Sequence, residues 1–147
     1  MRNNFKGKKC LLKIFTDGAS RGNPGDAAIA FIIEDGKGTI LEQYNEPIGV
    51  ATNNIAEYTA VIKALKRAVF HCKDQIQCFS DSELFVKQMN GEYKVKKRHI
   101  KELYSKVKDL EKKFKLVTYF NLPRENPKIA KVDKLANKVL DRMNKFR

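Results

Sequence analysis

The stretch IFTDGASRGNPG, residues 14–25, joins an apolar run to an aspartate and then to a segment rich in turn residues. The apolar run begins at Cys10 and predicts a short, mostly buried strand that ends at Asp17. Three of the eight glycines in the chain follow this aspartate, at Gly18, Gly22 and Gly25. Glycine leaves space free of side chains and permits turns that other residues resist. The pattern therefore indicates a carboxylate at the end of a buried strand, followed by a segment with few bulky side chains.

Outward from this stretch, the apolar spacing predicts four more strands and four helices. The strands are expected at 27–35, 39–49, 75–81 and 115–123, and the helices at 53–71, 82–91, 99–114 and 129–146. The DGKG turn at 35–38 predicts a hairpin, so the first three strands form an antiparallel meander. Helices and strands then alternate. This order predicts an α/β fold with a mixed five-stranded sheet, three antiparallel strands followed by parallel ones, and helices on both faces.

The composition is that of a globular chain. With 147 residues, 42% hydrophobic and 32% charged, residues 1–147 are expected to form one domain, with residues 1–10 as a basic N-terminal extension. No apolar run is long enough for a membrane span, and the N-terminus lacks the apolar core of a signal peptide. Three cysteines, at positions 10, 72 and 78, cannot all pair, and none has zinc-site spacing. We therefore expect a cytoplasmic protein in a reducing compartment.

The net charge of +13 is unevenly distributed along the chain. Residues 1–91 hold 12 basic and 10 acidic side chains, whereas residues 92–147 hold 18 and 7. A strongly basic half suits a polyanionic partner such as a nucleic acid, because each neutralised phosphate releases counterions. A lysine-rich surface that only keeps the protein in solution is an equally open interpretation.

Four carboxylates stand at places where the predicted fold can bring them together. Two end strands of the sheet and two lie in the first turns of helices: Asp17, Glu57, Asp81 and Asp133. Clustered carboxylates raise one another's pKa, so such a group makes sense around a hard divalent cation. Mg²⁺ prefers carboxylate and water oxygens, and neither histidine lies near these motifs.

Each carboxylate also has a simpler interpretation. Asp17 with Gly18 fits an ordinary turn, and a lone Glu57 fits a solvent-facing helix position. Asp81, or a serine beside it, could cap the following helix. Asp133 could complement a helix dipole. Only the joint pattern favours a metal site.

Four segments taken together resemble the type 1 ribonuclease H family. They are TDGASRGNPG, TNNIAEYTA, FSDSELFV and VDKLANKVL, and they occur in the family's order over nearly the whole chain from Cys10. The resemblance implies the ribonuclease H fold and endonucleolytic hydrolysis of the RNA strand of an RNA–DNA hybrid, giving 5′-phosphate products. It implies two Mg²⁺ or Mn²⁺ ions held by the four carboxylates, with Asp17 between both ions and Asp133 on the side of the nucleophile.

The resemblance also implies substrate contacts. These involve Gly18, Ser20, Asn23, Asn53 and Asn54 in the minor groove, where the 2′-hydroxyl distinguishes RNA from DNA. Helix capping is the alternative for Asn53 and Asn54.

The chain departs from many relatives in two places. Many relatives carry a histidine in the loop before the last helix, where it helps the product to leave. This chain has no histidine there, and Arg124 or Glu125 is expected to take that role. Many bacterial relatives bind the substrate with a basic helix that carries a tryptophan, and this chain has no tryptophan. The basic run that includes Lys96, Lys97 and Arg98 is expected to bind phosphate in its place. The alternative is that this run is a solvated helix start.

Three further interpretations remain beside hybrid cleavage by a monomer. A module of the same fold could bind a hybrid or duplex RNA with little cleavage, and the enzyme could also cut duplex RNA. A nucleotide enzyme using residues 17–25 as a phosphate loop is disfavoured, because a strand rather than a helix is predicted to follow.

Overall fold

The computed structural model describes residues 9–145, so most of the predicted N-terminal extension lies outside the described residues. The strands are β1 (Leu11–Gly22), β2 (Gly25–Asp35), β3 (Ile40–Ala51), β4 (Gln75–Ser80) and β5 (Leu116–Asn121). The helices are α1 (Asn53–Ala68), α2 (Glu83–Met89), α3 (Arg98–Glu111) and α4 (Pro127–Asn144). The sheet order is β3-β2-β1-β4-β5. β1, β2 and β3 pair antiparallel, whereas β4 and β5 add in parallel, which confirms the predicted mixed sheet and meander.

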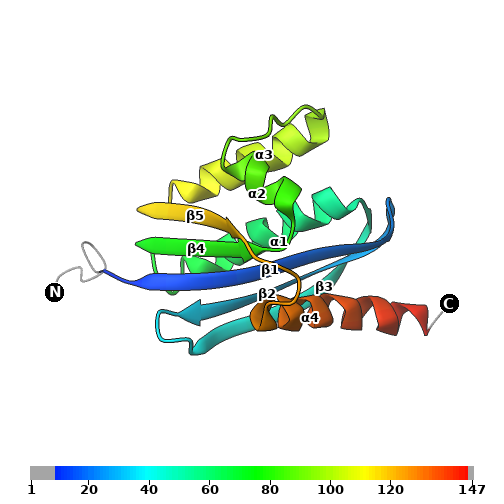
Figure 1. The fold of residues 1–147 in the computed structure, drawn as a ribbon, viewed down its shortest axis with the longest axis horizontal. Helices are drawn as coiled ribbons and strands as arrows, with labels where there is room; N and C mark the ends of the chain where they lie inside the picture. Colours follow the sequence, from blue (N-terminus) through cyan, green and yellow to red (C-terminus); the bar gives the residue numbers. More distant parts are fainter. Residues whose placement is uncertain (1–8, 146–147) are drawn as a thin grey trace.

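Helices cover both faces of the sheet. Figure 1 shows α1, α2 and α3 on one side and α4 on the other, next to β1, β2 and β3. β2 lies between these layers, and every side chain from Ala27 to Ile33 is at most 2% exposed. Because successive side chains of a strand point to opposite faces, a strand buried on both faces shows an unbroken apolar run. The apolar run of β2 therefore places it in the middle of the molecule.

Local capping fixes where two site-bearing helices begin. Thr52 caps α1, since its side chain accepts a hydrogen bond from the backbone N–H of Ile55 at 3.2 Å. Asn126 caps α4, and Pro127 occupies the first helical position, where its missing N–H costs nothing. α4 therefore begins two residues earlier than predicted.

The predicted end of the first strand was wrong. β1 does not end at Asp17 but continues to Gly22, because its pairing with β2 runs on to the Gly22–Gly25 pair. Its parallel pairing with β4 stops much earlier, at Phe15 and Phe79. Asp17 thus lies within β1, just past the point where one of its two neighbouring strands has ended.

A disulfide joins Cys10, just before β1, to Cys72, in the segment between α1 and β4. Cys78 is buried and free. The cysteine count gave no indication of this pair, so the sequence argument for a reducing compartment loses its basis. Within residues 9–145, no helix combines the length and apolarity needed to cross a membrane.

Candidate active site

Asp17 and Asp81 lie side by side because the two strands that carry them are in register. Phe15 pairs with Phe79 at the last β1–β4 rung, and each aspartate follows two residues later. The two phenylalanine rings stack at a centroid distance of 4.9 Å. Side chains two residues apart on a strand point to the same face, so both carboxylates lie on the face of the two phenylalanines. β4 ends at Ser80, so the carboxylates lie where β1 no longer has β4 beside it.

Glu57 reaches the same point from α1, on the opposite face of the sheet. A side chain at Gly18 would lie 2.2 Å from the carbonyl carbon of Ala56, so the backbones of β1 and α1 touch here. This contact gives Gly18 a structural task that the sequence interpretation missed, since its bare Cα faces the helix. The close approach brings the neighbouring Glu57 to the end of β4.

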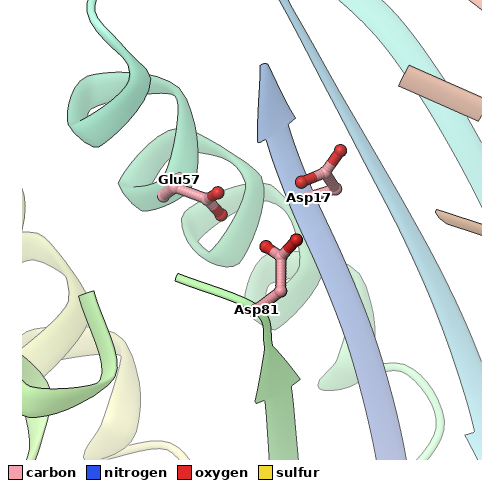
Figure 2. Close-up of side chains that lie close together, drawn as sticks. All are labelled: Asp17, Glu57 and Asp81. Atoms are coloured by element: carbon pink, nitrogen blue, oxygen red, sulfur yellow. The ribbon is translucent and has the colours of Figure 1, made fainter. Parts of the chain in front are cut away.

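These three carboxylates form one compact group. One oxygen from each of Asp17, Glu57 and Asp81 lies within 4.8 Å of the others. Figure 2 shows the three side chains converging from α1, from β1 and from the end of β4. Asp133, from α4, is outside that tight group but lines the same cavity of about 320 Å³. The structure therefore brings all four sequence-predicted carboxylates to one place.

Burial and mutual repulsion raise the pKa values of the three carboxylates in the compact group. Burial, with Asp81 and Asp133 nearby, raises the pKa of Asp17 from 3.8 to about 8. Burial also raises the pKa of Glu57 well above its ordinary value, with Asp17 and Asp81 adding to it, although the Gly18 backbone and Ser80 lower it. Burial raises the pKa of Asp81 as well, and Arg124 opposes that rise.

Two of these carboxylates have an oxygen with no hydrogen-bond partner. Asp17 Oδ2 and Glu57 Oε1 are buried, and neither bonds to a described residue. A buried carboxylate oxygen without a partner is costly. A divalent cation coordinated by such oxygens removes that cost, and hard cations take oxygen ligands. The donor set therefore fits Mg²⁺ or Mn²⁺.

The simpler interpretations of three carboxylates are excluded. Glu57 is 6% exposed and does not face solvent. Asp81 does not cap α2, because Ser82 does so by accepting from the N–H of Phe85 at 3.2 Å. Asp17 lies in a strand rather than in a turn.

Ser20, Asn23 and Asn53 tie the β1–β2 turn to the start of α1. Asn53 Oδ1 accepts from the N–H of Ser20 at 3.0 Å, and Asn23 Oδ1 accepts from the N–H of Asn53 at 2.9 Å. The Ser20 hydroxyl donates to the carbonyl of Ala51 at 2.7 Å. These oxygens are thus used within the protein, and neither Asn53 nor Asn54 is the cap of α1. The Oδ1 of Asn54 is buried without a partner among the described residues.

A second cavity, of about 460 Å³, lies next to the first, and Asn53 lines both. Among the described residues, those lining the second cavity include no carboxylate: they are Asn23, Thr52, Asn53, Asn54, Leu84, Gln88, Lys94, Lys96, Lys97, His99 and Ile100. Lys96 and Lys97 are thus brought beside the asparagines, together with Lys94. Arg98 begins α3 and is not part of this lining.

The structure distinguishes Arg124 from Glu125, the two residues that the sequence offered for a role in product release. Arg124 lines the acidic cavity, and its Nε lies 3.9 Å from Asp81 Oδ2 although its side chain is 76% exposed. Glu125 is exposed and does not line that cavity.

Three polar residues near Asp133 were not singled out from the sequence. Arg21 and Asn137 line the acidic cavity, and Arg21 pairs with Asp141 at 2.5 Å. Asn137 and Asp141 follow Asp133 at intervals of four residues, which places all three on one flank of a helix. That spacing was the signal available in the sequence.

Comparison with known proteins places this arrangement in a family. Residues 15–139 match a family described as reverse transcriptase-like. The crystal structure of ribonuclease H1 from the archaeon Halobacterium salinarum NRC-1 is 35% identical, with a TM-score of 0.84 over 89% of this chain and 98% of that one. The ribonuclease H domain of Rv2228c from Mycobacterium tuberculosis is 34% identical, with a TM-score of 0.87 over 93% and 98%.

A third structure, of LC11 ribonuclease H1 in complex with an RNA/DNA hybrid, is 38% identical, with a TM-score of 0.83 over 90% and 98%. The chain spans 35% of the length of the curated mycobacterial relatives that it matches at 37% identity. It spans 63% of the ribonuclease HI of Halobacterium salinarum. The family match over most of the chain, together with near-complete coverage of these solved structures, shows that the chain belongs to the type 1 ribonuclease H family.

Proposed function

We propose that this protein hydrolyses the RNA strand of RNA–DNA hybrids and leaves 5′-phosphate ends, with two Mg²⁺ or Mn²⁺ ions as cofactors. The observation that carries the proposal is the convergence of Asp17, Glu57 and Asp81, whose oxygens lie within 4.8 Å of one another. Membership of the ribonuclease H family supports the substrate, since the related LC11 enzyme was crystallised with an RNA/DNA hybrid.

The four carboxylates would hold the ions. Asp17 belongs to the compact group with Glu57 and Asp81 and lines one cavity with Asp133, so it is the carboxylate that we propose would contact both ions. When bound, paired divalent ions supply a water of lowered pKa and stabilise the departing 3′ oxygen. Asp17 Oδ2 and Glu57 Oε1, which are buried without a partner in residues 9–145, would each gain one from a cation.

The protein's own groups prepare this site. Ser80 and the Gly18 backbone act on the Glu57 carboxyl and favour its charged form. Arg124 stands at the mouth of the cavity beside Asp81, where its positive charge offsets part of the acidic repulsion and can meet the negative charge of a phosphate. We assign Arg124, rather than Glu125, to the loop role in product release.

The two neighbouring cavities suit the two strands of a hybrid. The acidic cavity would take the RNA strand, and the cavity lined by Lys94, Lys96 and Lys97 would take phosphates of the DNA strand. Asn53 lines both cavities, so it lies where the minor groove between the two strands of a bound hybrid would pass over the protein. Gly18 and Ser20 line the acidic cavity and Asn23 and Asn54 the lysine-lined one, where each would contact the hybrid. Arg98 follows Lys97 at the start of α3 and would add a further positive charge.

The test compares four labelled substrates, namely hybrid, duplex RNA, duplex DNA and single-stranded RNA, with and without Mg²⁺ or Mn²⁺. We expect metal-dependent cleavage of the RNA in the hybrid, reduced at least about 100-fold in D81N. Cleavage of DNA but not of the hybrid would overturn the substrate assignment. Hybrid binding without cleavage by the parent would instead favour a binding module.

Three finer expectations belong to the same proposal. Duplex RNA is the second candidate substrate, which the same assay decides. The chain is expected to act as a monomer, which sedimentation measures. Cytoplasmic location was predicted from the sequence, and the Cys10–Cys72 disulfide argues against a reducing compartment; fractionation of cells decides between them.

A further inference from the structure

Asp133 is held by a hydrogen bond from its own helix. The Asn137 side-chain Nδ2 donates to Asp133 Oδ1 at 3.2 Å and to the Asp133 backbone carbonyl at 3.0 Å. Asp133 is the one predicted ligand that comes from the α4 layer, and it is outside the compact group of three. Its direction therefore depends on the Asn137 contact within α4 and on its interaction with Asp17 across the cavity.

Arg21 fixes which end of the Asn137 amide faces Asp133. Its Nη2 donates to Asn137 Oδ1 at 3.2 Å and to Asp141 Oδ1 at 2.5 Å. A guanidinium has only donors, and an amide has one accepting and one donating end. With its oxygen engaged by Arg21, Asn137 must present its NH₂ group to Asp133. The reverse orientation would set an oxygen against both the carboxylate and the carbonyl.

We propose that Arg21 and Asn137 are positioning residues that orient Asp133 towards a bound divalent cation, with Asp141 holding Arg21 in place. This inference rests on the proposed function. The chain of contacts crosses from the end of β1 to α4, so it also fixes the α4 flank of the acidic cavity against the strand that carries Asp17. Partners of this kind, one contact removed from a metal, commonly affect metal affinity or activity 10–100-fold when removed.

A direct role is the alternative for Arg21. Its side chain is 35% exposed and lines the acidic cavity, so it could contact a substrate phosphate instead of acting through Asn137. The two roles differ in what they change. A positioning residue alters metal affinity without substrate and alters kcat, whereas a phosphate contact alters KM and its dependence on salt.

The experiment measures Mn²⁺ affinity by calorimetry on the whole chain without substrate, and kcat and KM on a hybrid. We expect N137A to weaken Mn²⁺ binding and to lower kcat about 10-fold, and R21A to do so to a smaller extent, with KM within about 2-fold. R21A/N137A is expected to be no worse than N137A, and R21K to recover part of the loss. In a D133A background, N137A should have no further effect on Mn²⁺ affinity.

R67A is the matched control. Arg67 is exposed, on α1 and away from the acidic cavity. Its replacement removes its ion pair with Glu42 at 3.0 Å and its contact with the Phe70 ring, both at the surface. The proposal is overturned if N137A leaves Mn²⁺ affinity at the R67A level, or if R21A raises KM alone. If the parent fails to cleave hybrids, the proposed function fails, and the Mn²⁺ measurements still decide this inference.

Discussion

Gly18 and Ala56 are in backbone contact, so closely that a methyl group on Gly18 would lie 2.2 Å from the Ala56 carbonyl carbon and 2.4 Å from the N of Glu57. G18A must therefore push α1 away from β1. We expect a loss of about 3 kcal/mol in the free energy of unfolding, the upper range for overpacking, and a large loss of cleavage as Glu57 is displaced. Chemical denaturation measures the first and a hybrid cleavage assay the second.

G36A is the control for that variant. A Cβ at Gly36 would meet only the Leu11 region at 3.8 Å, which is ordinary contact. Stability and cleavage close to those of the parent are expected. Equal effects of G18A and G36A would refute the backbone contact.

The acidic group makes the metal-free protein sensitive to pH. The pKa of Asp17 is raised from 3.8 to about 8, so between these values the folded state binds more protons than the unfolded state. Stability without metal should then fall as pH rises from about 4 to about 8 and level off above. D17N should remove this component and be more stable than the parent at pH 8 by over about 1.4 kcal/mol, the equivalent of one pKa unit.

The measurement is unfolding in EDTA across that pH range, with D17N as reference so that other carboxylates cancel. Added Mg²⁺ should stabilise the parent most at high pH, because metal and protons compete for the same oxygens. A difference between parent and D17N that does not change with pH would contradict the raised pKa.

The cavity next to Asn53 should determine how salt affects binding. Replacing Lys94, Lys96 and Lys97 by glutamine removes three charges from that cavity. We expect KM for the hybrid to rise and the salt dependence of log KM to become shallower, by up to about 0.9 for each phosphate that is no longer neutralised. kcat should stay near the parent value, because these side chains are outside the acidic cavity.

The matched control is K106Q/K112Q/K113Q, which removes the same charge from exposed positions on and just after α3. It should leave KM nearly unchanged. If both triple variants shift KM equally, general charge rather than this cavity attracts the substrate.

The disulfide predicts a stability effect without a catalytic one. Cys10 and Cys72 are 62 residues apart in sequence, so the bond restrains a long loop of the unfolded chain. C10S/C72S should lose about 2–4 kcal/mol of stability and keep its specific activity. Thiol reductant should lower the melting temperature of the parent and not of C10S/C72S; equal behaviour of the two would show that the bond does not form.

The sequence predicted the sheet and the convergence of the acidic residues because both depend on local patterns. Apolar periodicity predicted the elements, and Asp17 and Asp81 each come two residues after the last rung that pairs β1 with β4. Periodicity failed at the end of β1, since the pairing from Asp17 to Gly22 depends on hairpin register rather than on apolar residues.

Contacts between residues far apart in the chain were also missed by the sequence-based predictions. The Arg21–Asn137 contact joins residues 116 positions apart, and the ion pair of Glu34 with Lys128 at 2.6 Å joins residues 94 apart. No local pattern selects such partners among many lysines and acids. The role of Gly18 was missed for the same reason, because only the path of α1 shows what occupies the space beside it.

The short length of β4 has a wider consequence. β1 has twelve residues and β4 only six, and the last rung between them is at Phe15 and Phe79. Longer pairing would form more backbone hydrogen bonds and would fill the opening through which Glu57 meets the two aspartates. The early end of β4 thus costs the sheet some interstrand hydrogen bonds and leaves room for the three carboxylates to meet. An insertion that prolonged β4 should therefore give a more stable protein of the same fold that has lost its activity.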